Sequence, residues 1–228
     1  MGMLQSLPQI ITAIGGLGTA AFGLVDSTKP FWGGVNRIGF KRIARTTASL
    51  TPGAAASGLT QAKIIDTLRA NWYNGTDLNS QKAIAKSLIK QGLNPGNASK
   101  LAHATGVDGT ILQTVATKIV AGTPLASNET DVYARFDFTL TALLDEAYQR
   151  SDEAYISGTR VVASIFALAL AFVGGWSLNA GSLQAYLGSK DMWMALIAGL
   201  LATPLAPIAK DLSSALAAAV NTMQIIKR

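Results

Sequence analysis

One uncharged stretch constrains the fold of this chain more than any other feature. Between Val161 and Ser189 the sequence contains no Asp, Glu, Lys or Arg. As an α-helix, its first part, Val161–Leu178, would be about 27 Å long, close to the thickness of the hydrocarbon core of a bilayer. We therefore predict a transmembrane helix here. The charged residues before it contain no helix breaker except Gly158, so the same helix is predicted to begin in a soluble region, with Gly158 as its hinge.

Two other segments are equally free of charge, residues 1–25 and Met192–Ala209. The whole chain is 49% hydrophobic and only 14% charged, with a mean hydropathy of +0.30. Soluble domains carry roughly one-quarter charged residues. The sequence thus predicts an all-α integral membrane protein with three transmembrane helices and a helical soluble domain between the first and second. Because it has no Cys, disulfides and thiolate metal sites are excluded.

The spacing of charges, caps and Gly or Pro residues divides the chain into seven predicted segments. They are a first transmembrane helix (1–25), a basic juxtamembrane segment and linker (26–58), a small helical domain (59–127), a long helix ending in the second span (128–178), a short outer loop (179–191), a third transmembrane helix (192–209) and an amphipathic C-terminal helix (210–228).

The first apolar segment carries small residues on one helical face: Ala13, Gly16, Ala20 and Gly23. Small side chains let two helices approach closely in lipid, so this face is predicted to pack against another helix. The alternative is that small residues are simply common in membrane helices. Residues 16–21 also fit a G-x-G-x-x-A pattern, but no acidic residue lies about twenty positions later, so we predict no dinucleotide site.

Basic residues follow the first segment closely: Arg37, Lys41, Arg42 and Arg45. By the positive-inside bias, they predict a cytoplasmic location for this flank and an outside N-terminus. Their spacing suggests a helix on the inner leaflet that binds anionic headgroups, with Phe31 and Trp32 at headgroup level. The alternative is that residues 36–46 pack onto the soluble domain. The sequence leaves both possibilities open.

The soluble region is predicted to contain four short helices within residues 59–127. Four residues can cap their N-termini: Thr60, Ser80, Asn97 and Asp108. Gly residues follow each apolar-periodic segment, as is typical of helix C-termini. Because apolar residues recur at spacings of three and four, these helices can share one core.

The long helix is predicted to begin at Asn128 and to reach Leu178. Its inward stripe is expected to include Phe136, Leu140 and Leu143. The acidic residues Asp145, Glu146, Asp152 and Glu153 also lie on it. From Asp26 to Ile119 there are 12 basic and 4 acidic residues, and from Val120 to Arg160 there are 3 basic and 7 acidic. We therefore predict that these carboxylates attract the basic half, within or between subunits, rather than act in catalysis.

Aromatic residues bracket the predicted outer loop, as expected for residues at an outer membrane interface: Trp176, Tyr186 and Trp193. The third apolar segment would return the chain to the cytoplasm, with Pro204 and Pro207 kinking its inner end. Lys210, Lys227 and Arg228 follow it. The predicted topology therefore has an outside N-terminus, and a cytoplasmic central domain and C-terminus.

No pattern of catalytic or metal-ligating residues is present. The sequence has no P-loop, no Ser/His/Asp set, and only one histidine, His103. We expect a non-catalytic membrane scaffold or assembly subunit, binding the bilayer and self-associating through the first helix or joining other membrane subunits, without cofactor or nucleic acid. A channel subunit with Thr12, Thr19 and Ser164 along its path, and an accessory subunit of a membrane enzyme complex, are the alternatives.

Overall fold

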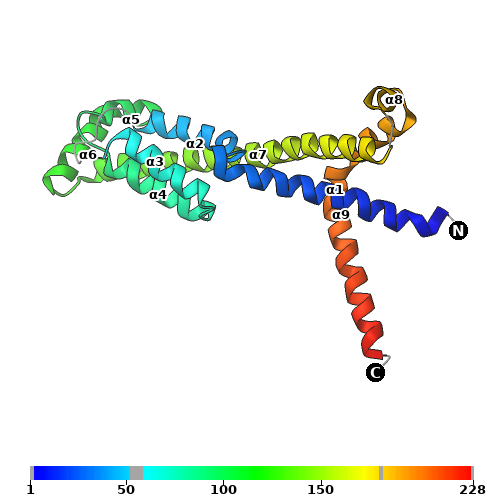
Figure 1. The fold of residues 1–228 in the computed structure, drawn as a ribbon. Helices are drawn as coiled ribbons and strands as arrows, with labels where there is room; N and C mark the ends of the chain where they lie inside the picture. The colour runs from blue at the N-terminus through cyan, green and yellow to red at the C-terminus, as the bar shows by residue number, and fades with distance from the viewer. Residues whose placement is uncertain (1–2, 52–58, 180–181, 227–228) are drawn as a thin grey trace. The chain divides into compact units, whose positions relative to one another are not determined.

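The computed structural model describes residues 3–51, 59–179 and 182–226. Side chains of residues 3–9, of Trp32 and of residues 209–226 lie outside the description. Every regular element in the described part of the chain is a helix, which confirms the all-α prediction. The helices are α1 (Met3–Trp32), α2 (Asn36–Leu50), α3 (Gln61–Tyr73), α4 (Leu78–Gln91), α5 (Ala98–Thr105), α6 (Gly109–Ala121), α7 (Ser127–Leu178), α8 (Leu183–Leu187) and α9 (Lys190–Ile226) (Figure 1).

The chain folds into two compact units. One, here called the head, comprises Asn36–Tyr155; the other, here called the apolar unit, comprises the chain up to Val35 and from Ile156 onward. Three helices are long and apolar enough to cross a membrane: α1 over Ile10–Phe31, α7, and α9 over Lys190–Ile208. These agree with the three predicted membrane segments.

The N-terminal half of α7 forms the spine of the head. Its residues Phe136, Leu140, Leu144 and Tyr148 recur every four positions and are fully buried. They share one core with apolar residues from α2 to α6, among them Ile64, Leu68, Ile89, Leu101 and Leu112. The four-residue spacing places Leu144 at the centre of the stripe, with the predicted Leu143 partly buried beside it. Leu143 only borders the core.

Helix α2 belongs to the head because its apolar face packs into this core. Phe40, Ile43 and Leu50 are buried there. Gly39 lets α2 approach the end of the spine: a methyl group at this position would lie 2.6 Å from Trp72 and 3.0 Å from the carbonyl oxygen of Ser151. Packing onto the soluble domain, one of the two alternatives for residues 36–46, is therefore what the structure has.

The first and last residues of the head lie close together. The indole Nε1 of Trp72 donates to the carbonyl oxygen of Asn36 at 3.1 Å, and its ring packs edge-on against Tyr155 at 6.1 Å. Trp72 thus bridges the point where the chain enters the head and the point where it leaves. Both connections to the apolar unit start from one end of the head.

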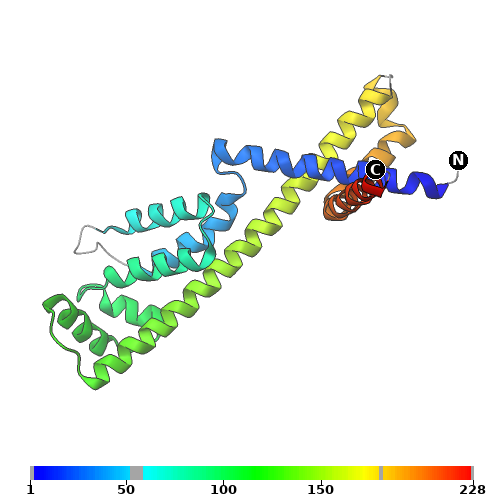
Figure 2. The same ribbon diagram turned by 90° about the horizontal axis from the view of Figure 1, so that it is seen from below.

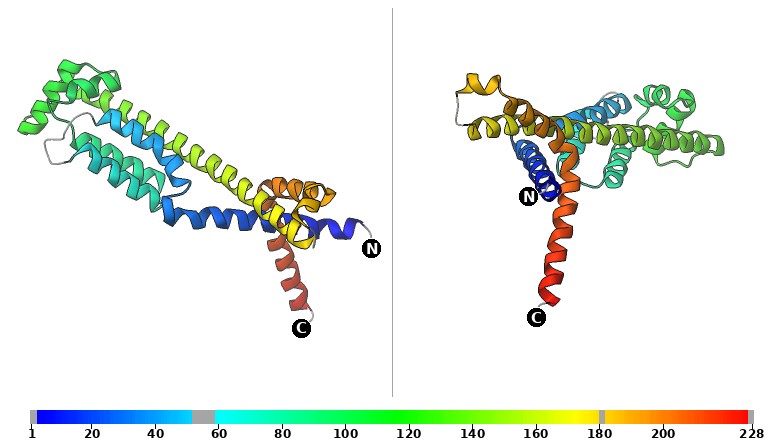
Figure 3. Two further views of the ribbon diagram at one scale, coloured as in Figure 1. Left: turned by 45° about the horizontal axis from the view of Figure 1, so that its top comes forward. Right: turned by 90° about the vertical axis from the view of Figure 1, so that its right-hand side faces the viewer.

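The long helix is continuous, as Figure 2 shows for α7, and begins one residue before the predicted Asn128. It passes through Gly158 without a break, and the hinge there stays a prediction. Helix α9 likewise continues through Pro204 and Pro207 to Ile226 (Figure 3), so the third membrane segment and the C-terminal helix are one element. The apolar stripe predicted for residues 210–228 lies outside the described side chains.

Candidate interaction surfaces

The inner face of α1 packs closely against α9. Gly15, Gly18, Ala21 and Val25 are buried on one face of the helix, and Gly18 on this face lies against α9. A methyl group at position 18 would overlap the backbone carbonyl of Ala202 and lie 2.9 Å from Cβ of Ala206. Only glycine permits this backbone approach, which is the usual way membrane helices gain contact area in the absence of a hydrophobic driving force.

The predicted small-residue face of α1 is a different one. Ala13, Gly16, Ala20 and Gly23 are exposed, and a methyl group at Gly16 or Gly23 would meet nothing within 4 Å. At 100° per residue these four positions lie opposite the face buried against α9. The outer face of α1, defined by these four residues, is therefore not covered by the described part of the chain, and close packing there stays a prediction.

A second row of small residues, which was not predicted, joins α7 to α9. Ala163, Ala167 and Ala171 are buried at four-residue intervals. Gly199 of α9 lies against them: a methyl group there would be 2.9 Å from Cα of Leu168 and 3.0 Å from Cβ of Ala171. The four-residue spacing of the alanines at 163, 167 and 171 could have predicted this contact. It is hard to recognise in the sequence because Ala also occurs at 169.

The predicted outer-interface residues do not all have that role. Trp176 and Trp193 are exposed, as the prediction requires, whereas Tyr186 of α8 is fully buried. Its ring packs against Phe172 at 5.4 Å, and its hydroxyl lies over Gly175, where any side chain would collide with it. Tyr186 is therefore a packing residue whose hydroxyl occupies the space left by the missing side chain at Gly175, and its place at the outer interface stays a prediction.

The four basic residues of α2 form a surface of their own. Arg37, Lys41 and Arg45 are exposed, Arg42 is half-buried, and Ile38 between them is 49% exposed. We call these five residues the cationic face of α2; they cover the side of the helix opposite Phe40 and Ile43. Within the described residues, none of the four basic side chains makes an ion pair. The helix contains no acidic residue.

The lysines of α4, in contrast, are paired with carboxylates of α7. Asp137 accepts from Lys86 at 2.6 Å and from Lys90 at 2.8 Å, and Asp145 pairs with Lys82 at 2.7 Å. The predicted attraction between the acidic and basic halves is therefore confirmed within one chain for Asp145. Glu146 pairs with Arg150 on its own helix, and Asp152 and Glu153 make no ion pair among the described residues.

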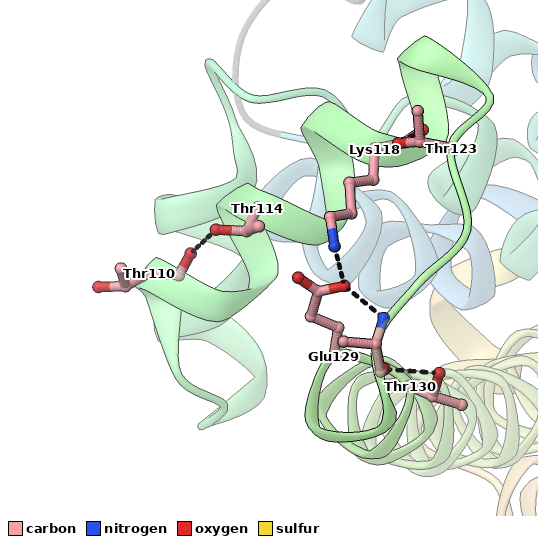
Figure 4. A network of polar contacts seen from close by, with 7 residues as sticks. Thr110, Thr114, Lys118, Thr123, Glu129 and Thr130 are labelled. Carbon is pink, nitrogen blue, oxygen red and sulfur yellow. Dashed lines mark hydrogen bonds and ion pairs between the residues drawn. The ribbon is translucent and has the colours of Figure 1, made fainter.

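A further pair fixes the start of α7, as the close-up in Figure 4 shows. Glu129 accepts from Lys118 of α6 and from the backbone N–H of Ala126, both at 2.7 Å. The second bond is half of a capping box, in which the side chain of the third helical residue, Glu129, accepts from the backbone N–H of the residue just before the helix, Ala126. The N-terminus of α7 is thus capped by Glu129, and the helix begins at Ser127 rather than at the predicted Asn128.

These contacts shift the ionisation of the groups involved. Burial raises the pKa of Asp137, but the hydrogen bonds from Lys86 and Lys90 outweigh it and hold the pKa below its ordinary value. Burial lowers the pKa of Lys90, but its hydrogen bond to Asp137 and the nearby Tyr133 raise it above the ordinary value. Both partners are thus held in their charged forms, as expected for structural ion pairs.

Metal-ligating side chains do not gather at one place in the described part of the chain. No group of three or more His, Asp or Glu side chains is placed to hold a metal ion within that part of the chain. His103 is exposed. No protein-family model, curated protein or solved structure matches the chain. The outer face of α1 and the cationic face of α2 are therefore the two surfaces from which a function can be argued.

Proposed function

We propose that this protein is a non-catalytic, multi-pass membrane scaffold or assembly subunit that self-associates through the outer face of α1. The observation that carries the proposal is the separation of the two small-residue faces. The chain uses Gly18 for its own packing against α9, and the outer face with Gly16 and Gly23 remains open to another helix. In lipid, such a face gains contact energy only when a second backbone comes close.

The same chain offers matched substitutions to test this proposal. Gly16→Leu fills the outer face, whereas Gly174→Leu makes the same change on α7, where a methyl group also meets nothing within 4 Å. We expect wild type extracted in mild detergent to have the mass of a homo-oligomer, Gly16→Leu to shift towards monomer, and Gly174→Leu to behave as wild type. A monodisperse wild-type monomer, or equal effects of the two substitutions, would contradict self-association through this face.

A different partner on the same face would make the protein an accessory subunit of a larger complex. Extraction from native membranes distinguishes the two cases, because the mass then includes a second polypeptide that Gly16→Leu releases. A channel is less well supported. Thr19 donates to the carbonyl of Gly15 in its own helix, and Ser164 donates to Thr203 of α9 at 3.2 Å, so both hydroxyls already have partners in the same chain.

The proposed topology places the head and the C-terminus in the cytoplasm and the N-terminus outside. The support is the density of basic residues after α1 and the absence of charge before it. Because the chain has no native Cys, a single Cys can report on sidedness. Leu187→Cys should react with an impermeant maleimide in intact cells and Val120→Cys only after permeabilisation; both positions are exposed. The reverse pattern would overturn this topology.

A further inference from the structure

We infer that the cationic face of α2 binds the anionic headgroups of membrane lipids and thereby holds one side of the head on the bilayer surface. This inference requires α1 to span the membrane, but it is independent of self-association. It differs from an inserted amphipathic helix, because the apolar face of α2 is already buried in the head.

The first argument is that the head leaves this charge uncompensated. Lys82, Lys86, Lys90 and Lys118 all have carboxylate partners on α7. Within the described residues no carboxylate pairs with the four basic residues of α2, whose side chains point away from the core. A cluster of four cations on two turns of helix attracts a surface of negative charge.

The second argument is chain connectivity. The first candidate span ends at Phe31, six residues before Arg37, so the Cα of Arg37 lies within about 20 Å of the end of the span. Two glycines with positive φ, Gly33 at 72° and Gly34 at 46°, form the turn between α1 and α2. The cationic face is about 12 Å long from Arg37 to Arg45. Juxtamembrane basic clusters of this kind are attracted to anionic lipid, and each Lys or Arg near the surface raises the binding ratio roughly fivefold.

The third argument concerns the mode of binding. Ile38 is the only apolar member of the face, so little apolar area is available for insertion into the acyl region. Binding is then mainly electrostatic and falls steeply with salt, because the Debye length shortens from about 10 Å at 0.1 M to about 3 Å at 1 M. An inserted helix would keep most of its binding over this range.

The test uses the full-length protein in lipid nanodiscs. An environment-sensitive dye on Ile38→Cys reports on the cationic face, and the same dye on Val120→Cys, 69% exposed on α6, serves as the control. Discs of pure phosphatidylcholine are compared with discs in which about a third of the lipid is phosphatidylglycerol. We expect a dye response to the anionic lipid at Ile38 only, and its loss on raising the salt.

Charge substitutions then show whether the dye response depends on the basic residues of α2. With the dye on Ile38→Cys, Lys41→Gln with Arg45→Gln should lower the ratio of membrane-bound to unbound heads by roughly tenfold or more. Lys100→Gln with Arg135→Gln removes the same net charge from exposed positions elsewhere on the head and should leave the ratio unchanged. The inference is wrong if lipid composition has no effect, if both pairs reduce the response equally, or if polyuridylate or an acidic protein shifts the dye where anionic lipid does not.

Discussion

The pairing of α4 with α7 through Asp137 gives the sharpest prediction about the stability of the head. Replacing it by Asn keeps the size of the side chain and removes its charge, so both ammonium partners lose their carboxylate. The side chain of Asp137 is 25% exposed, and those of Lys86 and Lys90 are 29% and 31% exposed. The pairs are therefore intermediate between surface ion pairs and buried ones.

The expected loss of stability in Asp137→Asn follows from this intermediate burial. Exposed ion pairs contribute about 0.2–1 kcal/mol each, and hydrogen bonds to charged groups contribute about 1.5–3 kcal/mol. The lysines can turn into solvent after the substitution, which limits the cost of leaving them unpaired. For Asp137→Asn we therefore expect the free energy of opening of α4 to fall by about 1–2 kcal/mol, or roughly 5- to 30-fold in the opening equilibrium.

Hydrogen exchange of the full-length protein in nanodiscs measures this locally. Amides of Leu78–Gln91 should exchange roughly 5- to 30-fold faster in Asp137→Asn than in wild type. The control is Glu146→Gln, which breaks a pair whose side chains are 53% and 55% exposed. Its effect should be about 0.3–0.5 kcal/mol, close to the error of the method. Equal protection in wild type and Asp137→Asn would refute the argument.

The free energy of opening of α4 differs between wild type and Asp137→Asn, and the pH dependence of this difference checks the sign of the ion-pair contribution. The pKa of Asp137 is lowered in the folded head, so its contribution is complete above its ordinary pKa near 4 and is lost as the pH falls through the lower folded value. The pKa of Lys90 is raised, so its contribution is complete below its ordinary pKa and is lost as the pH rises through the folded value. The difference between wild type and Asp137→Asn should be constant from about pH 5 to pH 9 and shrink below pH 4.

Three other substitutions in the head have expected outcomes. Gly39→Leu should destabilise the head by about 1–3 kcal/mol or more, measured by denaturant unfolding, because its side chain has no room beside Trp72. Glu129→Gln should weaken the start of α7, seen as faster exchange there, and this loss should vanish at low pH because the hydrogen bond from Lys118 lowers the pKa of the wild-type carboxyl. Tyr148→Phe should cost less than about 1 kcal/mol in unfolding free energy, because the lost hydrogen bond is long at 3.4 Å.

Local signals in the sequence predicted the elements of the head well. Thr60 and Asp108 cap α3 and α6 as expected, with bonds to Lys63 and Ile111. Ser80 does not cap α4. The cap is Asp77, whose carboxylate accepts from the backbone N–H of Ser80 at 2.9 Å. Both residue types are good caps, so spacing alone could not decide between them.

Contacts between distant segments were predicted less well, and glycine is the common reason. A helical wheel shows that α1 has small residues on two opposite faces, but it cannot show which face α9 covers. The contact is decided by shape, because Gly18 fits against the carbonyl of Ala202. The same applies to Tyr186, whose position depends on Gly175 eleven residues earlier.

The two sides of α2 have different surroundings, and this limits how the helix can bind a membrane. An amphipathic basic helix next to a membrane segment can place its apolar side either in lipid or in a protein core. Here Ile43 and Leu50 enter the core, and Gly39 lets the backbone lie against the spine. The apolar side is then no longer available to lipid, whereas the basic side remains exposed six to fourteen residues after the end of the α1 span. Any attachment of the head to the membrane through α2 must therefore be electrostatic, and its sensitivity to salt is the property that distinguishes it from insertion.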